Sequence, residues 1–326
     1  MTHKSIITAA AWFAACISLP WHQVSAQTYP ERTVRIVVPY VAGGNLDVTT
    51  RLFAEGLTTE LGQTFFVENR PGANGNTGTA QVARTAPDGY TLAMVSVGTM
   101  AINPAMYRNM GFDPEKDLAP ISIVATAPMA LVANNNMPFR TMAELVSYAK
   151  ANPGKLNFGS GGVGSLAHLS AEMLRARTGA DIVHVPYKGA ALALNDVMAG
   201  TIQVGFDTIN TSAPLIKDGR LRIIAVTSGK RSAAFPNVPT VGEAGINDYA
   251  AETWAGLVAP AGTPRETIMR IQTVIAKIAA REQTQSRLAA TGSEAVAGTP
   301  EQFVATLRAD RARWAEIVKV SGARAE

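Results

Sequence analysis

Cysteine, aromatic residues and charge are all scarce in this chain of 326 residues. The only cysteine is Cys16, so the remaining chain has no thiol for a disulfide or a thiolate metal site. Charged residues make up 17% of the chain, the net charge is +4, and no window gathers five or six like charges. These values argue against nucleic acid as a partner, because phosphate recognition needs a concentrated basic surface.

The sequence also lacks complete signatures of catalysis and of cofactor binding. It has no G-x-S-x-G elbow, and His168 and His184 do not stand in a metal-binding spacing. Residues 159–164 match G-x-G-x-x-G, but Asp181 precedes the next expected strand, whereas a dinucleotide site needs an acidic residue at that strand's end. Sugar-binding sites usually stack aromatic rings on the sugar, but only 6% of the residues are aromatic and Tyr40 is the one obvious candidate for such a ring. These observations disfavour a sugar-binding module. We expect neither a cofactor nor a metal.

The first residues predict an export signal. Lys4 precedes an apolar run over residues 6–19, Pro20 ends that run, and residues 24–26 form a small-residue cleavage site. We expect residues 1–26 to be removed and the mature protein to reside in the periplasm. A membrane anchor is the alternative, but about 14 apolar residues fall short of the roughly 20 that span a bilayer. A lipoprotein attached through Cys16 is a second alternative.

Short apolar runs alternate with amphipathic stretches from residue 33 to residue 226. A hydrophobic content of 47% supports a packed core, and the length fits about two domains of roughly 150 residues. The alternation predicts an α/β fold with parallel-rich sheets flanked by helices. The expected strands are 33–39, 65–68, 90–97, 121–124, 130–133, 156–159, 182–187, 204–206 and 221–226, and the expected helices are 46–57, 142–151, 165–178, 190–199 and 212–218.

The last part of the chain is expected to be helical. Isoleucines at 268, 271, 275 and 278 form one apolar stripe at helical spacing. A second helix is predicted to start at Thr299, because this N-cap residue is followed by Pro300 and by Gln302 in the capping-box position. Phe303 and Trp314 of that helix would face the core.

Two similar units point to a cleft. Residues 34–57 and 155–178 each run from a strand through a glycine-rich turn into a helix. Such turns leave backbone N–H groups at a helix start, where they attract an anion, and ligands of open α/β sheets bind beside them. Asp47 in the first unit is either a helix cap or a hydrogen-bond acceptor for the ligand. Asp207, which follows an expected strand, either faces the cleft or is a buried carboxylate with a structural partner.

An enzymatic alternative also starts from these turns. A secreted hydrolase or esterase would use Ser160 or Ser165 as nucleophile with His168 as base. Binding needs only convergent N–H donors, which the turns supply, whereas hydrolysis needs a nucleophile and a base that are held together. We therefore expect a binding protein and not an enzyme.

Several motifs taken together resemble one known family. In chain order they are residues 29–30, 36–44 with Asp47, 67–72, 86–91, 183–189, 221–227, 238–240 and 243–245. The set is similar to the substrate-binding receptors of tripartite tricarboxylate transporters, the Bug family, and it covers essentially the whole chain after residue 27. At candidate ligand-facing positions this chain departs from the pattern, with Ala42 in place of a proline and Asn45-Leu46 in place of a Ser-Thr pair.

The resemblance implies a periplasmic binding protein of type II-like architecture, with the ligand cleft between its two domains. Residues 27–125 and 252–326 would form a discontinuous first domain, and residues 126–251 the second. The ligand-binding residues that the resemblance implies are Tyr40, Gly43, Gly44, Asn45, Asp47, Ser96, Thr99, Ser160, Gly164, Ser165, His168 and Asp207.

The two glycine turns also predict a ligand class. If the helix starts at 43–46 and 162–166 face each other, they suit a small mono- or dicarboxylate, an acidic amino acid or an aromatic acid better than a tricarboxylate. If only one turn bound a carboxylate, ligands with a single carboxylate would be preferred. The partner that the resemblance implies is a membrane permease of one large and one small subunit, and the receptor itself would be a monomer. The alternative is an orphan receptor that passes its ligand to a sensor.

Overall fold

The computed structural model describes residues 29–324. The expected export signal, its cleavage site and Cys16 lie outside the described residues. Among residues 29–324, no helix combines the length and apolar character needed to cross a membrane. Within the same range, no three His, Cys, Asp or Glu side chains gather in a way that could hold a metal ion.

The strands form one mixed sheet with two parallel ends. Its order is β2-β1-β3-β9-β4-β7-β5-β6, and both β8 and β10 pair with β4. At one end β1 runs parallel to β2 and β3, and at the other β5 runs parallel to β6 and β7. The bounds are β1 Val34–Val38, β2 Phe65–Asn69, β3 Thr91–Ser96, β4 Leu118–Ala133, β5 Leu156–Ser160, β6 Ile182–Pro186, β7 Val204–Thr208, β8 Arg222–Val226, β9 Glu252–Pro260 and β10 Glu294–Ala295.

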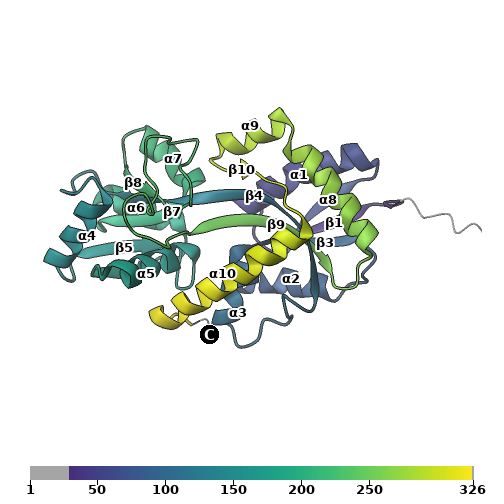
Figure 1. Ribbon diagram of the computed structural model, residues 1–326, viewed down its shortest axis with the longest axis horizontal. Coiled ribbons are helices and arrows are strands. Elements are labelled where there is room, and N and C mark those ends of the chain that lie inside the picture. Colours follow the sequence, from purple (N-terminus) through teal and green to yellow (C-terminus); the bar gives the residue numbers. More distant parts are fainter. Residues whose placement is uncertain (1–28, 325–326) are drawn as a thin grey trace, which may run out of the picture.

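The central strands β4 and β9 join the two ends of the sheet (Figure 1). They pair antiparallel, and β9 pairs with β3 on its other side while β4 pairs with β7. The prediction of separate strands at 121–124 and 130–133 was wrong, because β4 is a single strand of 16 residues. Pairing to β9 as far as Pro128 and to β7 from Met129 onward keeps the intervening residues extended.

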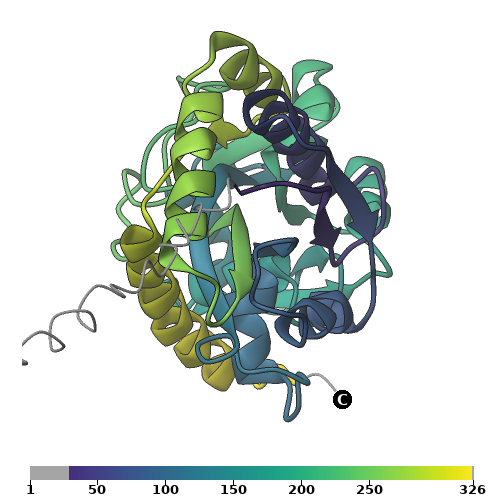
Figure 2. The same ribbon diagram turned by 90° about the vertical axis from the view of Figure 1, so that its right-hand side faces the viewer.

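The helices lie on both faces of this sheet. Figure 2 shows them around the sheet in a second view. Helices α4 and α6 have the predicted bounds, and α10 begins with the predicted capping box at Thr299. The bounds are α1 Asn45–Leu61, α2 Asn76–Ala83, α3 Asn103–Met106, α4 Met142–Ala151, α5 Leu166–Thr178, α6 Ala190–Ala199, α7 Ile209–Lys217, α8 Arg265–Ala279, α9 Glu282–Ala290 and α10 Pro300–Ser321, with short turns η1 Ala73–Gly75 and η2 Gly98–Ile102.

We call β1, β2 and β3 with α1, α2, α3 and α8 the first half, and β5 to β8 with α4 to α7 the second half. One hydrophobic cluster lies inside the first half around Phe53 and Ile275. A larger cluster runs through both halves and includes Met100, Phe158 and Trp314. Helix α10, yellow in Figure 1, contributes Trp314 and packs against η2, α3, β4 and α5. The α/β architecture predicted from the alternating pattern is confirmed, and α10 connects its two halves.

Candidate functional site

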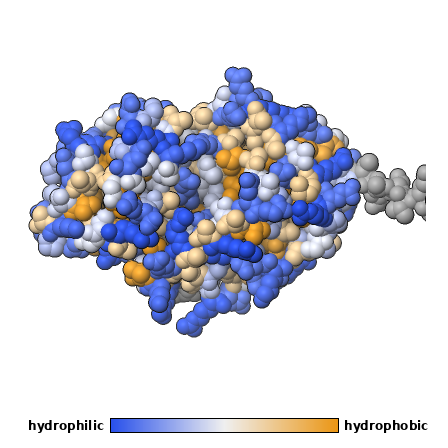
Figure 3. Space-filling view, in the orientation of Figure 1, coloured by the Kyte–Doolittle hydropathy of each residue, from blue (hydrophilic) through white to orange (hydrophobic). Residues whose placement is uncertain are grey.

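A cavity of about 330 Å³ lies between the two halves, beside the central strands. One side is the segment from Tyr40 to Asp47 together with Ser96 at the end of β3. Residues 125–127 of β4 and 253–255 of β9 form its floor, and Thr208 at the end of β7 approaches from the second half. Among residues 29–324, no lysine, arginine or histidine lines this cavity. In the face shown in Figure 3, hydrophobic patches lie in the region between the two halves.

The start of helix α1 supplies N–H donors to this cavity. Its N-cap residue is Gly44, which has extended backbone angles and no side chain to cap the helix. Val48 is the first residue whose N–H bonds back to the helix, donating to the Gly44 carbonyl at 3.0 Å. The N–H groups of Asn45, Leu46 and Asp47 therefore have no carbonyl partner in the helix, and all three residues line the cavity. With the positive end of the helix dipole, they form an anion-binding arrangement.

Asp47 fastens the loop that precedes α1. Its carboxylate accepts from the Gly43 N–H at 2.9 Å, from Asn69 Nδ2 at 2.9 Å and from Arg51 Nε at 3.0 Å. Arg51 also pairs with the second oxygen at 3.0 Å. Burial raises the pKa of Asp47, but the bonds from Arg51, Gly43 and Asn69 outweigh burial and hold the pKa below its usual value. The geometry favours the structural interpretation of Asp47, which holds the loop before α1 and leaves the helix start itself uncapped.

Replacing Asp47 by alanine is expected to lower the free energy of unfolding by about 2 kcal/mol, because it leaves Gly43, Asn69 and Arg51 without their acceptor. Urea unfolding at pH 7 measures this change. The matched control is Glu55→Ala on the same helix, which removes an exposed ion pair with Arg287 and should change stability by under about 0.5 kcal/mol. Equal effects of the two substitutions would contradict the proposed role of Asp47.

The ring of Tyr40 forms a rigid wall of the cavity. Its hydroxyl lies 3.1 Å from Ser96 Oγ and 2.9 Å from Thr99 Oγ1, and it donates to the Asn74 carbonyl at 3.2 Å. Burial raises the pKa of Tyr40 even though the hydroxyls of Ser96 and Thr99 oppose that rise. Tyr40 is therefore neutral at pH 7. Ser96 lines the cavity, whereas Thr99 is fully buried behind the tyrosine and acts through it.

Helix α7 approaches the cavity from the second half. Thr208 is its N-cap residue, lines the cavity and makes no side-chain cap hydrogen bond. Asn210 Nδ2 donates to Asn45 Oδ1 at 2.7 Å, and this bond joins the start of α7 to the start of α1. The same Nδ2 also donates to Ser293 Oγ at 3.2 Å. The bond between Asn210 and Asn45 thus joins the two halves directly beside the cavity, which Asn45 lines.

Asp207 lies just before α7, is 5% exposed and does not line the cavity. It accepts a hydrogen bond from the Thr211 hydroxyl. Burial raises the pKa of Asp207 to about 6, against the opposing hydrogen bonds from Thr211 and Thr208. Of the two interpretations left open by the sequence, the structure favours the buried carboxylate with a structural partner.

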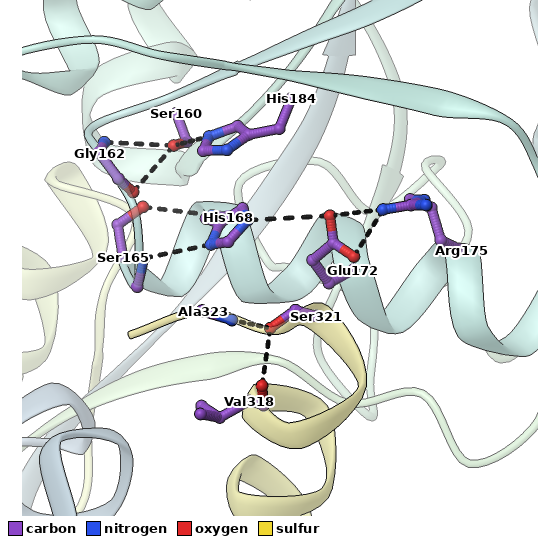
Figure 4. Close-up of polar contacts among 11 residues, drawn as sticks. Ser160, Gly162, Ser165, His168, Glu172, Arg175, His184, Val318, Ser321 and Ala323 are labelled. Atoms are coloured by element: carbon purple, nitrogen blue, oxygen red, sulfur yellow. Dashed lines mark hydrogen bonds and ion pairs between the residues drawn. The ribbon is translucent and has the colours of Figure 1, made fainter. Parts of the chain in front are cut away.

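The second glycine-rich turn is built differently from the first (Figure 4). Ser165 caps α5 by accepting from the His168 N–H at 3.2 Å, and the Gly164 N–H donates to His168 Nδ1 at 3.1 Å. Ser160 Oγ accepts from the Gly162 N–H at 3.2 Å. The N–H groups of Gly162, Gly164, Ser165 and His168 thus have acceptors within the turn and the first turn of α5. The expected opposition of the helix starts at 43–46 and 162–166 is replaced, at this cavity, by that of α1 and α7.

The serine and histidine side chains do not form the arrangement that the hydrolase alternative requires. Ser160 Oγ lies 2.6 Å from Nε2 of His184, not of His168. Ser160 is 1% exposed, so a substrate carbonyl has no access to its hydroxyl. The ring of His168 faces the Gly164 N–H and, at 3.7 Å, the Glu172 carboxylate. No nucleophile and base meet at the cavity in the described part of the chain.

The structure thus brings together one part of the predicted site and adds residues that the sequence argument missed. Tyr40, Gly44, Asn45, Asp47 and Ser96 line the cavity. Six predicted residues lie behind it or away from it besides Asp207, namely Gly43, Thr99, Ser160, Gly164, Ser165 and His168. The missed residues are Thr208, Ser293, Trp254 and the neighbours of Trp254 on β4 and β9. The polar Thr126 and Thr253 inside otherwise apolar strands were the available signal.

Comparisons with known proteins agree with the fold. Residues 49–323 match the family described as "Tripartite tricarboxylate transporter family receptor". Protein BugT of Bordetella pertussis is 35% identical over 302 residues, which cover 92% of this chain and 93% of BugT. Among solved structures, Rpa4515 of R. palustris "with adipate" has a TM-score of 0.80 and 35% identity, covering 91% of this chain and 99% of that one. MatC from Rhodopseudomonas palustris "with bound malate" has a TM-score of 0.75 and 28% identity, covering 89% of this chain and all of MatC.

Proposed function

This chain belongs to the tripartite tricarboxylate transporter receptor family, a family of non-enzymatic solute receptors, and on that premise we propose that it binds a small carboxylate in the cavity beside β4 and β9. The observation that carries the proposal is the uncapped start of α1, whose N–H groups open onto the cavity. A carboxylate there accepts several N–H bonds at the positive end of a helix dipole. Relatives solved with adipate and with malate support the same ligand class.

The lining of the cavity narrows the class of ligand. Leu46, Trp254 and the alanines of β4 and β9 provide an apolar middle, while Ser96, Thr208 and Ser293 place hydroxyls around it. This pattern suits a carboxylate with a hydrocarbon or aromatic body, and a second carboxylate would meet hydroxyls and the uncapped start of α7. A third carboxylate would have no cation to pair with. An amine would need a free acceptor, and the carboxylate of Asp47 is already fully used.

We further propose that the receptor works in the periplasm, as the export signal expected over residues 1–26 implies. It would act as a monomer that delivers its ligand to a cognate membrane permease of one large and one small subunit. The two domains would be residues 27–125 with 252–326, and residues 126–251. The fact that β4 and β9 alone carry the sheet from one half to the other supports this division.

A binding screen tests the ligand class. We expect at least one of adipate, malate and benzoate to bind, and glucose and lysine not to bind, because only the carboxylates can accept from the α1 N–H groups. A ligand at 100 times its Kd should add about 2.7 kcal/mol to the free energy of unfolding, which a thermal-shift assay detects. Isothermal titration calorimetry then gives each Kd. A set of hits made only of sugars or cationic amino acids would contradict the proposal.

A further inference from the structure

The turn 160–165 in the second half rests on the first half and not on the cavity. Gly164 has φ +77°, and a Cβ at this position would lie 2.2 Å from Met106 Cε and 2.3 Å from Met106 Sδ. Met106 is the last residue of α3 and is 6% exposed. The thioether of Met106 therefore packs directly against the backbone of Gly164. This contact joins α3 of the first half to the turn 160–165 of the second half.

We propose that His168 is a positioning residue whose neutral ring holds the turn 160–165 against Met106, and that protonation of this ring releases the turn and weakens ligand binding. The first part concerns the fold alone, whereas the effect on binding rests on the function proposed above.

The hydrogen bonds of His168 define which ring nitrogen carries the proton. Because the Gly164 N–H donates to Nδ1 at 3.1 Å, Nδ1 must be the unprotonated nitrogen. The proton then sits on Nε2, which points toward Glu172 Oε1 at 3.7 Å. A doubly protonated ring would place an N–H on Nδ1 opposite the N–H of Gly164. Two donors cannot share that position, so the turn must move away.

The surroundings of His168 keep its ring neutral (Figure 4). On α5 itself, Arg175 Nη1 donates to both oxygens of the Glu172 carboxylate, at 2.8 Å and 3.0 Å. From β6, the ring of His184 stacks on His168 with centroids 4.0 Å apart. From β5, the ring of Phe158 lies nearly parallel to that of His168, with centroids 6.3 Å apart. Burial first, and then the positive charge of Arg175, lower the pKa of His168 to about 4.

The direction of the pH effect follows from that lowered pKa. An opened turn exposes His168 to water, where its pKa returns toward 6.5, so the open state binds more protons than the closed state. The stabilisation of the closed turn relative to the open one is fully present above about pH 6.5 and is lost as the pH falls toward 4. Between pH 7 and pH 5 the two pKa values give about a 20-fold increase in opening.

Two other groups titrate in the same window and must be separated from His168. His184, whose pKa burial and then the charge of His168 lower to about 4, contacts Ser160 of the same turn and changes in the same direction. Asp207 has a raised pKa of about 6, so its contribution to stability grows as the pH falls. Variants at position 168 are therefore compared with the wild type at each pH.

Two substitutions at position 168 test whether the hydrogen-bond acceptor at Nδ1, and not the imidazole ring as such, holds the turn. His168→Asn places an amide oxygen where Nδ1 was and cannot be protonated, whereas His168→Gln places its amide at the position of Nε2. The measurement is hydrogen exchange of the Gly164 amide by NMR on the full chain at pH 7 and pH 5, corrected for intrinsic rates and referenced to amides of β4. Ligand affinity is measured in parallel with adipate by calorimetry.

In the wild type, protection of Gly164 is expected to fall at least about 20-fold from pH 7 to pH 5, with His168 contributing about 20-fold and His184 the rest. In His168→Asn, the Gly164 amide should stay protected at both pH values, except for the loss at pH 5 that protonation of His184 causes. In His168→Gln, the Gly164 amide should lose its protection at both pH values. Equal protection in the wild type at pH 7 and pH 5, or wild-type protection in His168→Gln, would overturn the proposal.

If the exchange behaves as expected but adipate affinity does not follow it, the role in binding fails while the role in holding the turn stands. If adipate does not bind the wild type at all, the function proposed above fails for this ligand, and the exchange result still decides the role of His168.

Discussion

Replacing Gly44 by aspartate is expected to weaken carboxylate binding at least 100-fold while leaving the protein as stable as before or slightly more stable. The new carboxylate would cap α1 and accept from the same N–H groups that the ligand needs. A like charge about 4 Å away costs about 4 kcal/mol at an effective dielectric of 20, and 100-fold in Kd corresponds to about 2.7 kcal/mol. The backbone accepts the change, because Gly44 has φ −72° and a Cβ there meets only the Val41 carbonyl, at 3.6 Å.

Calorimetry with the best carboxylate of the screen and thermal unfolding without ligand measure the two effects on one protein. Gly44→Ala is the first control, because it adds a Cβ but leaves the N–H groups free and should retain most of the affinity. Gly44→Asn is the second control, because asparagine caps the helix without adding a charge. Its Kd for the carboxylate should lie between the values for Gly44→Ala and Gly44→Asp. If Gly44→Asp bound the carboxylate as tightly as Gly44→Ala, the start of α1 would not be the anion site.

Replacing Gly256 by alanine is expected to lower the free energy of unfolding by about 3 kcal/mol, through overpacking of the core. Gly256 lies in β9, and a Cβ there would lie 2.3 Å from Phe303 Cζ and 2.7 Å from Phe303 Cε1. Phe303 is fully buried and packs edge-on against Trp254 with centroids 5.2 Å apart. Because Trp254 lines the cavity, displacement of Phe303 should also weaken ligand binding.

Urea unfolding of Gly256→Ala, Phe303→Leu and the double variant tests this explanation. Leucine is smaller than phenylalanine and removes the ring atoms that a Cβ at position 256 would meet. The double variant should therefore be more stable than the sum of the two single effects predicts, with a coupling of at least about 1 kcal/mol. Additive effects would mean that the loss in Gly256→Ala has a cause other than contact with Phe303.

Much of the fold was predictable because its signals are local. Apolar periodicity located most strands to within one or two residues, and Thr299 with Gln302 located the start of α10. The list of expected elements lacked η1, η2, α2, α3, α9, β9 and β10, and the shortest of these have too few residues for a periodic pattern. The interruption between 121–124 and 130–133 misled the prediction for β4, since pairing with strands on both sides, and not local preference, keeps that segment extended.

The site was predictable to a smaller extent. The glycine turn that leads into α1 was indicated by its position after a strand, whereas Tyr40 and Ser96 were implied by the family resemblance. The turn 160–165 carries the same local pattern, yet in the structure the N–H groups of Gly162 and Gly164 donate to Ser160 and His168, and the backbone of Gly164 meets Met106. The acceptors of these two N–H groups lie two and four residues away, so of these contacts only the one with Met106 comes from a distant part of the sequence.

The sequence by itself determined the α/β class, the positions of most helices and strands, and the glycine turn before α1 that can receive an anion. These properties follow from hydrophobic periodicity, capping residues and glycine geometry, all of which act within a few residues. The tertiary structure decided that α7 and not α5 faces α1 across the cavity, that β4 and β9 form the cavity floor, and that Ser160 pairs with His184. The reason is physical: burial, pKa and the availability of a hydrogen-bond donor depend on side chains that the fold brings together from distant parts of the chain.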